Sequence, residues 1–237
     1  MVTVSTSELE ASKEWNAKGV AFSSDEELDK AIECYDRAIK LDPNNIYAWV
    51  NRGNAYLAKK LYDKAIECYE EAIRIDPSYI DARDNLGMAY SAKKDFDKAL
   101  KYFKEAIKLD PEDSYIWKDM AGLFIAKKHA LKAIKYYKKA LENNPEDADT
   151  WYEMGNTYAS AYDWFNLEKL FNIREGLSEA IDCYQKAIEI DPDHKGAWNK
   201  LGDIYVLKQN FYEAVICYGK IDEYNKIIGC YKKLLEK

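Results

Sequence analysis

The sequence predicts an all-α protein built as a tandem array of one repeated segment, and two observations support this prediction. The first is the spacing of the prolines, which follow one another at intervals of 34, 34, 34 and 47 residues: Pro43, Pro77, Pro111, Pro145 and Pro192. The second is helical periodicity, because Trp49, Gly53 and Tyr56 lie at i, i+4 and i+7 on one face of a helix. A second face of this kind follows in the same repeat, formed by Ala65, Tyr69 and Ala72.

The same columns of residues recur in six repeats. The leading column is Trp15, Trp49, Arg83, Trp117, Trp151 and Trp198. Four residues on is a small residue in each repeat, Gly19, Gly53, Gly87, Ala121, Gly155 and Gly202, and three residues later a ring, Phe22, Tyr56, Tyr90, Phe124, Tyr158 and Tyr205. The later half of each repeat carries Ala31, Ala65, Ala99, Ala133, Ala180 and Ala214, each followed four residues on by Tyr35, Tyr69, Phe103, Tyr137, Tyr184 or Tyr218.

These residue types suit a pair of closely packed helices. Small residues allow two helices to approach, and the rings fill the remaining volume. The Asp-Pro or Asn-Pro pair ends the second helix, because the residue before proline leaves the α region and proline has no N–H to donate. One pair alone would leave an apolar face in water, so stability requires neighbouring repeats.

This order of Trp, Gly, Tyr, Ala, aromatic, Ala and Pro resembles the tetratricopeptide repeat. The resemblance covers about residues 12–228. It implies an α-solenoid, a right-handed superhelix of antiparallel helix pairs, A then B, whose concave side is lined by the A helices. The predicted segments are an N-terminal lead at 1–11, repeats at 12–45, 46–79, 80–113, 114–147, 148–194 and 195–221, and a C-terminal capping half repeat at 222–237.

The two ends of the chain carry further signals. Ser7 and Glu10 have the spacing of a capping box, which predicts that the first helix begins near Ser7. At the other end, Ile227, Tyr231 and Leu234 reproduce the spacing of a helix B with larger residues. This pattern predicts a half repeat without its A helix, whose apolar face covers the end of the sixth repeat.

Composition excludes several classes of function. A net charge of -7 and a pI near 5.1 argue against nucleic acid as a partner, because phosphate binding needs a concentrated basic face. No stretch is apolar enough to span a membrane and the first residues lack a signal pattern, so we expect a cytoplasmic protein. We expect buried, reduced thiols at the five cysteines, Cys34, Cys68, Cys183, Cys217 and Cys230.

Nothing in the sequence indicates catalysis or a cofactor. His129 and His194 lie in different repeats without a nearby nucleophile or ligand cluster, and no glycine-rich phosphate loop is present. Lysines recur at the A-to-B turns, as Lys59-Lys60, Lys93-Lys94, Lys127-Lys128 and Lys208. We interpret them as partners for helix C-terminal carbonyls, with a ridge for an acidic ligand as the alternative. We expect neither enzyme activity, nor a metal, nor a cofactor.

The resemblance implies a protein-protein interaction module, an adaptor that holds an extended peptide in the concave groove. The groove residues that it implies are Tyr47, Asn51, Asn54, Asp81, Asp84, Asn85, Tyr115, Lys118, Asp119, Tyr152, Glu153, Asn156, Asn199, Lys200 and Asp203. Acidic side chains outnumber lysines among them and tyrosines lie between, so a basic or mixed apolar peptide is the expected ligand.

Asn51 and Asn85 occupy one column in adjacent repeats and resemble an asparagine ladder that holds a peptide backbone. The alternative is that they are solvated polar residues. A carboxylate clamp of the kind found in chaperone-binding relatives is not expected, because Asn16 and Val20 stand where a lysine and an asparagine would be needed.

The break in the period adds 13 residues between Tyr158 and Ala180, near 162–174. This insertion carries the apolar residues Trp164, Phe165, Leu167, Leu170 and Phe171. It is expected to extend helix A, with a turn near 172–176. It could pad a neighbouring repeat, fold over the groove, or form a second interaction surface. The last possibility gives the alternative function, a scaffold that forms homo-oligomers through this insertion or a terminal helix.

Overall fold

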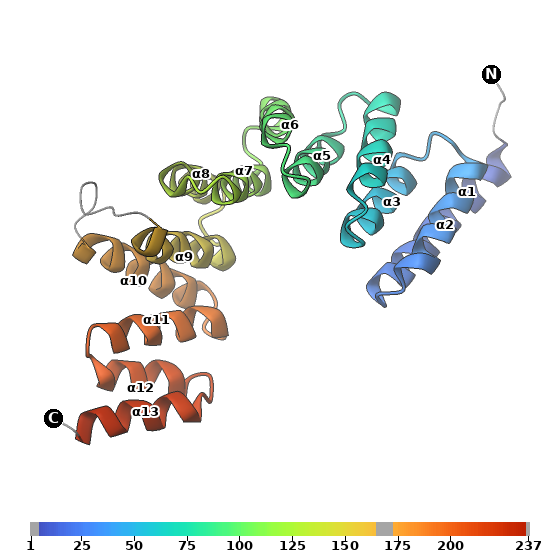
Figure 1. The fold of residues 1–237 in the computed structure, drawn as a ribbon. Coiled ribbons are helices and arrows are strands. Elements are labelled where there is room, and N and C mark those ends of the chain that lie inside the picture. Colours follow the sequence, from blue (N-terminus) through green and yellow to red (C-terminus); the bar gives the residue numbers. More distant parts are fainter. Residues whose placement is uncertain (1–4, 165–172, 236–237) are drawn as a thin grey trace. The chain divides into compact units, whose positions relative to one another are not determined.

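The computed structural model describes residues 5–164 and 173–235, and it describes side chains outside 161–164 and 173–175. All regular secondary structure in these residues is α-helical, which confirms the predicted all-α class. Successive helices form antiparallel pairs, A then B, and each helix packs chiefly on its neighbours in the chain (Figure 1).

The chain divides into two compact units, Met1–Glu112 and Asp113–Lys237. The first unit holds three helix pairs: α1 (Thr6–Ser24) with α2 (Leu28–Leu41), α3 (Ile46–Ala58) with α4 (Tyr62–Ile75), and α5 (Ile80–Ala92) with α6 (Phe96–Leu109). The second holds three pairs and a single last helix: α7 (Ser114–Ala126) with α8 (Ala130–Asn143), α9 (Ala148–Trp164) with α10 (Ile173–Ile190), α11 (Lys195–Leu207) with α12 (Phe211–Gly219), and α13 (Tyr224–Leu235).

The Asp-Pro pairs end the B helices as predicted, and their side chains also shape the loops. Helix α4 ends at Ile75, and the Asp76 carboxylate then accepts the backbone N–H of Ser78 at 2.8 Å. The leading tryptophan closes such a loop from the next helix. The Trp49 indole N–H donates to the Pro43 carbonyl at 2.9 Å, and the same bond recurs in the fifth and sixth repeats. In these three repeats the tryptophan therefore ties the start of helix A to the preceding loop.

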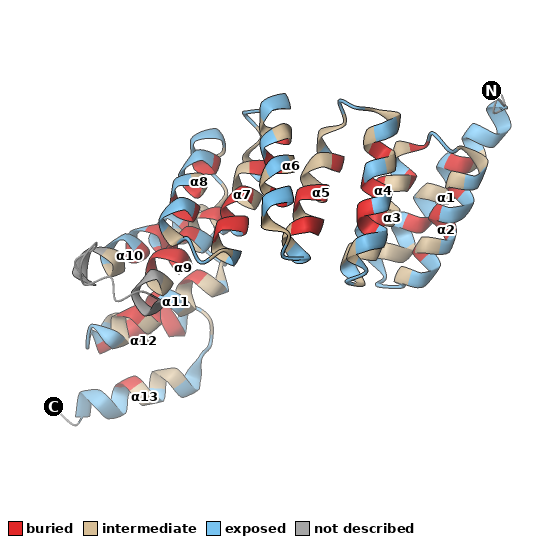
Figure 2. Cartoon of the chain, turned by 45° about the horizontal axis from the view of Figure 1, so that its top comes forward, coloured by how far each residue is buried: buried red, intermediate tan, exposed pale blue. Residues whose placement is uncertain are grey.

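The small-residue column lets helix B lie directly on helix A. A Cβ atom added at Gly53 would lie 2.5 Å from the Tyr69 ring, and the corresponding glycines of four other repeats meet their rings at 2.4 to 2.8 Å. The rings themselves are almost completely buried. Figure 2 shows buried residues along the helix faces that meet neighbouring helices.

The A-to-B turns share a left-handed residue that is not glycine. These residues, with φ between 59° and 66°, are Glu26, Lys60, Lys94, Lys128 and Gln209, and Asp222 in the turn between α12 and α13 has a similar φ of 57°. The preceding lysines make contacts across the repeat boundary, because Lys59 pairs with Asp29 and Lys93 Nζ lies 2.5 Å from Asp63 Oδ1. These pairs favour the structural interpretation of the turn lysines over a ridge for an acidic ligand.

Three local predictions are wrong, and the first concerns the start of α1. The capping box is formed by Ser5 and Glu8, not by Ser7 and Glu10: Ser5 N–H donates to Glu8 at 2.8 Å, and Glu8 N–H donates back to Ser5 at 3.3 Å. The spacing alone fits both pairs, and helix α1 begins at Thr6 because Ser5 is its extended N-cap residue.

The turn expected at 172–176 is also misplaced, since α10 is already helical from Ile173. Helix α9 does extend to Trp164, as predicted for the insertion. The proposed contact residues Phe165, Leu167, Leu170 and Phe171 lie outside the described residues, as does the side chain of Trp164.

The last helix, α13, takes the place of a helix A and not of a helix B. It follows α12 after a short loop and packs on it, as α3, α5, α9 and α11 pack on the B helices before them. Cys230 is its buried contact, in a cluster with Phe211, Ala214 and Tyr218. The half repeat therefore lacks its B helix, and the prediction failed because the ring spacing of the two helix types overlaps.

Candidate functional site

The predicted groove residues of the first compact unit lie on helices α3 and α5. Tyr47 is 65% exposed and meets Tyr79 edge to face, with ring centroids 6.2 Å apart. Asp81 is exposed as well, whereas Asp84 and Asn85 are half-buried. Burial raises the pKa of Tyr79 to about 12, with Asp81 contributing, so this phenol stays protonated at neutral pH.

Asn51, the first member of the proposed ladder, already has a partner in the neighbouring repeat. Its amide Nδ2 donates to Asn16 Oδ1 at 3.0 Å. A carboxamide has two donor hydrogens and an accepting oxygen, so this bond leaves the oxygen of Asn51 for another donor. The pair joins α1 to α3, a contact that sequence columns did not reveal because the two asparagines occupy different columns.

Three predicted groove residues accept hydrogen bonds from buried tyrosines of their own repeat. The acceptors are Asn54, Asn156 and Asp203, and the donors are the hydroxyls of Tyr69 at 2.7 Å, Tyr184 at 2.9 Å and Tyr218 at 2.9 Å. In the third repeat the same column holds Met88, and the ring opposite is Phe103, which has no hydroxyl. This column is therefore part of the core as well as of the A-helix surface.

In the second unit the predicted residues on α7 and α9 are mostly engaged within the fold. Lys118 Nζ lies 3.3 Å from Asp147 Oδ2, and Glu153 accepts the Tyr137 hydroxyl at 2.9 Å. Tyr152 lies against the His194 ring, with centroids 4.8 Å apart. Asp119 is half-buried, and Tyr115 remains 64% exposed beside Lys118.

The A-helix face of the sixth repeat binds a lysine of the chain itself. Lys226 of α13 donates to Asn199 Oδ1 at 2.6 Å and to Asp203 Oδ1 at 2.8 Å. Its ammonium also lies 5.0 Å from the Tyr218 ring centroid. Lys200, the remaining predicted residue of this repeat, is exposed. An amide oxygen, a carboxylate and a ring on this face thus suffice to hold a cation.

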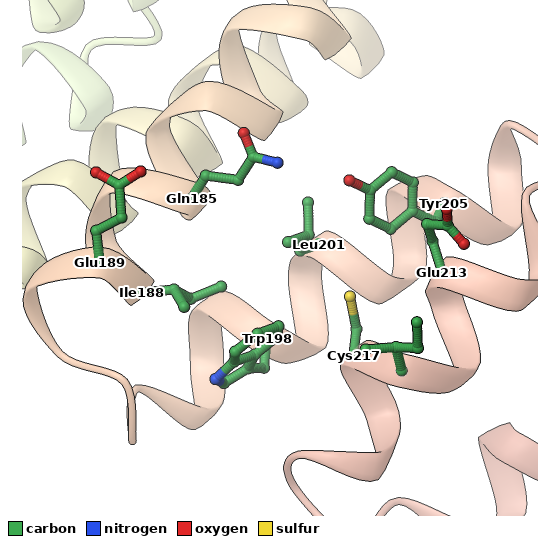
Figure 3. A pocket seen from close by; sticks show the side chains of 9 residues that line it. Gln185, Ile188, Glu189, Trp198, Leu201, Tyr205, Glu213 and Cys217 are labelled. Atoms are coloured by element: carbon green, nitrogen blue, oxygen red, sulfur yellow. The ribbon is translucent and has the colours of Figure 1, made fainter.

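A pocket in the second compact unit was not predicted. It has a volume of about 430 Å³ and lies between α10, α11 and α12 (Figure 3). Its lining includes Ile188, Trp198, Leu201, Tyr205, Glu213 and Ile216. The one feature of the sequence that could have indicated this pocket is Glu213, because the first four repeats have lysine at this position.

The described residues include neither a membrane-spanning helix nor a cluster of metal ligands. Across residues 5–164 and 173–235, no helix is long and apolar enough to cross a membrane. Over the same ranges, no three His, Cys, Asp or Glu side chains are grouped as a metal ion would require. All five cysteines are buried free thiols, as predicted.

The helix pairs with their ring and glycine columns define a helical repeat protein, and family models identify the repeat family. Models described as tetratricopeptide repeat match residues 46–79, 85–113, 119–147 and 136–174, and one described as TPR repeat matches 19–60 and 170–218. The chain belongs to the tetratricopeptide repeat family. No curated relative matches the chain.

Three solved structures with the same fold illustrate how similar this chain is to other proteins. YrrB, described as a TPR protein with an unusual peptide-binding site, is 27% identical, with a TM-score of 0.52 over 77% of this chain and 88% of that one. The pilF protein of Pseudomonas aeruginosa is 16% identical, with a TM-score of 0.71 over 98% and 100% of the two chains. Yeast Tom70 is 20% identical, with a TM-score of 0.71 over 87% of this chain and 43% of its own.

Proposed function

We propose that the A-helix faces bind an extended, basic or mixed apolar segment of another protein, so that the chain serves as an adaptor. Proteins of this family are generally non-enzymatic interaction modules, and this chain carries the repeats that define them. The observation that carries the proposal is the seat of Lys226 on Asn199 and Asp203, where the A-helix face of the sixth repeat holds an ammonium group.

The first unit offers a comparable face without such an occupant among the described residues. Asp81 and Tyr47 are exposed there, and Asn85 lies one repeat from Asn51 in the same column. Carboxylates favour a peptide with lysine or arginine, an exposed ring gives an apolar contact, and carboxamides can pair with any peptide backbone. The peptide-binding site named for YrrB supports the same use of the fold.

The test is a peptide screen followed by calorimetry with the double variant Asn51→Ala and Asn85→Ala. Selected peptides should be rich in lysine or arginine, and the variant should bind them with an affinity lower by roughly 1 to 3 kcal/mol. Asn225→Ala, an exposed asparagine on α13, is the control and should bind as the unchanged protein does. Selection of acidic peptides, or equal affinity for the double variant, would contradict the proposal.

Self-association is a second candidate function, favoured by one face of α13. Tyr224, Ile228, Tyr231 and Leu235 lie at i, i+4, i+7 and i+11 and are 52% to 87% exposed. In a complete repeat this face would meet helix B. Ile228, however, stands where six repeats have glycine or alanine, so a ring-bearing helix B could not approach as closely.

Light scattering tests this candidate. If two copies pair through α13, the protein should be a dimer at micromolar concentration, and Ile228→Glu should make it a monomer because two buried carboxylates would face each other. Leu207→Glu changes a 70% exposed leucine on α11 and serves as the control. A monomer before any substitution would rule this candidate out.

A further inference from the structure

The ring near the end of helix A takes a cation from its own repeat in each of the first four repeats. The cation is a lysine in the first turn of helix B, and it directly precedes the alanine that recurs in that helix. The pairs, with the distance from Nζ to the ring centroid, are Lys30 over Phe22 at 5.5 Å, Lys64 over Tyr56 at 5.3 Å, Lys98 over Tyr90 at 4.9 Å and Lys132 over Phe124 at 5.4 Å. A cation over a ring at this distance is an attractive contact.

The fifth repeat obtains its cation from the preceding helix B. Glu179 stands at the lysine position of this repeat, but Lys138 of α8 reaches the Tyr158 hydroxyl. The ring is therefore still accompanied by an ammonium group, although the repeat itself contributes a carboxylate.

The sixth repeat has neither lysine. Glu213 replaces the lysine of helix B, and Gln185 stands where the preceding repeat has Lys138. Among the residues that the structure describes, no cation lies over the Tyr205 ring, and Glu213 Oε2 is buried without a hydrogen-bond partner. Elsewhere in the pocket wall, Lys220 Nζ lies 5.9 Å from the Trp198 ring centroid.

The sixth repeat also lacks the side chain that covers this place in the third and fourth repeats, and like the first, second and fifth repeats it has a cysteine there. In the third and fourth repeats a helix B tyrosine stacks on the ring, Tyr102 on Tyr90 at 5.6 Å and Tyr136 on Phe124 at 5.1 Å. The corresponding residue of the sixth repeat is Cys217, which is smaller. The pocket of about 430 Å³ opens at this point, with Glu213 beside Tyr205 (Figure 3).

We propose that this pocket binds a lysine or arginine side chain of a partner protein, which takes the place that the chain's own lysines fill in the first four repeats. The ammonium or guanidinium group would pair with the Glu213 carboxylate and lie over the Tyr205 ring. The apolar stem of the side chain, and an apolar neighbour in the partner, would contact Ile188, Leu201 and the 46% exposed Ile216.

Charge and burial give this occupant its advantage over an apolar one. A buried carboxylate oxygen without a donor is costly, and an incoming cation supplies a charge-assisted bond to it. A second source of stabilisation is the ring, whose face attracts cations. The inference is independent of the proposed peptide-binding faces, because the pocket lining does not include Asn199, Lys200 or Asp203, the predicted groove residues of α11.

The test is a titration of the full chain followed by methyl NMR at Ile188, Leu201 and Ile216. The probe is the acetylated, amidated tripeptide Leu-Lys-Leu, and its comparison is the same peptide with norleucine, which lacks the ammonium group, in place of lysine. The lysine peptide should shift these methyl signals in a saturable manner and bind at least about fivefold more tightly than the norleucine peptide.

Variants separate the carboxylate from the rest of the pocket. Glu213→Gln should weaken binding of the lysine peptide at least about fivefold, and Glu213→Lys should abolish it by restoring the arrangement of the first four repeats. Glu213→Lys should also melt at no lower temperature than the unchanged protein, which shows that lost binding is not lost folding. Glu179→Gln, the equivalent change in the fifth repeat, is the matched control and should leave binding unchanged.

Three results would overturn the proposal. The first is equal binding of the lysine and norleucine peptides, or no shift with either, and the second is binding that survives Glu213→Lys. The third is binding of spermidine but not of the lysine peptide, which would assign the pocket to a free polyamine and not to a protein. If the lysine peptide shifts only methyl signals of α3 and α5 and none in the pocket, which is a form of the first result, the proposed function is supported while this inference fails.

Discussion

Individual tyrosine hydroxyls decide which residues of the A-helix face are free to act in binding. Asn54, Asn156 and Asp203 accept such hydroxyls, so replacing them would leave a buried donor unpaired and cost about 1 to 3 kcal/mol of stability. Asp81 interacts with the Tyr79 hydroxyl, whereas Asn85 carries no such bond among the described contacts. A loss of binding on changing Asn54 would therefore mix two effects, whereas changes at Asn85 report on the surface.

The glycine column predicts the effect of adding one methyl group to helix A. Gly53→Ala should destabilise the protein by about 1 to 3 kcal/mol, because the new methyl group would lie 2.5 Å from the Tyr69 ring and the two helices must separate. Urea unfolding followed by circular dichroism measures the change.

Gly122→Ala is the matched control for this prediction. It too lies inside a helix A, but a methyl group there meets nothing within 4 Å. Alanine should therefore raise stability by about 0.5 to 1 kcal/mol through its higher helix propensity. Equal effects of the two substitutions would contradict the role of close ring packing.

At the scale of helices, the A-to-B turn is the element with the most evident local strain. Lys60 adopts φ of 60°, a conformation that costs a residue with a Cβ atom about 1 kcal/mol and glycine very little. Five other turns, in both compact units, have the same arrangement with residues other than glycine. The turns thus leave room for stabilisation without any change in helix packing.

Lys60→Gly should stabilise the protein by about 0.5 to 1 kcal/mol, measured by urea unfolding. The control is Ala58→Gly, two residues earlier in the last turn of α3, where glycine should destabilise by a similar amount because the backbone is helical. If both variants lose stability, the left-handed residue is not the source of strain.

The sequence columns predicted the helix pairs, the helix ends at Asp-Pro and the buried cysteines, because each depends on residues close together in the chain. They did not predict the Asn51–Asn16 bond or the seat of Lys226, since these depend on the stagger between helices of successive repeats. The register of α13 failed for a related reason. Tyr224 and Tyr231 have the spacing of the two rings of a helix A, whereas Ile227, Tyr231 and Leu234 have the spacing of a helix B. Only the packing on α12 decides between the two.

Over the molecule as a whole, stability depends on many small contacts between neighbours and on groups buried in their neutral form. Buried thiols lie beneath the helix pairs in the first, second, fifth and sixth repeats, and burial raises the pKa of Cys183 to about 12 and of Cys217 to about 11, from an ordinary value of 9.0. Burial also raises the pKa of Tyr69, Tyr184 and Tyr218.

These shifts predict loss of stability in alkaline solution. The unfolded thiol loses its proton near pH 9, whereas the folded one keeps it until pH 11 to 12, so the folded state binds more protons in this range. The stability contributed by the neutral thiols is complete below pH 9 and is lost as the pH rises toward 11 and 12. The tyrosines extend the loss to higher pH.

Urea unfolding at several pH values from neutral to alkaline measures this dependence. Cys183→Ala should reduce the slope of unfolding free energy against pH above 9, and Cys183→Ala with Cys217→Ala should reduce it further. An unchanged slope in the double variant would show that the thiols do not carry the effect.

The ion pairs between turns have a consequence for how such a chain can grow. Lys59 reaches back to Asp29, and Lys93 reaches back to Asp63, each across 30 residues. A second copy of residues 46–79 placed directly after the first would offer a lysine to the existing Asp63 and a new aspartate to Lys93. At each boundary between repeats, the turn lysine would then again lie next to an aspartate of the preceding repeat. A gene encoding this chain could therefore lengthen by duplicating one such block in a single step, without any compensating substitution at the new junctions.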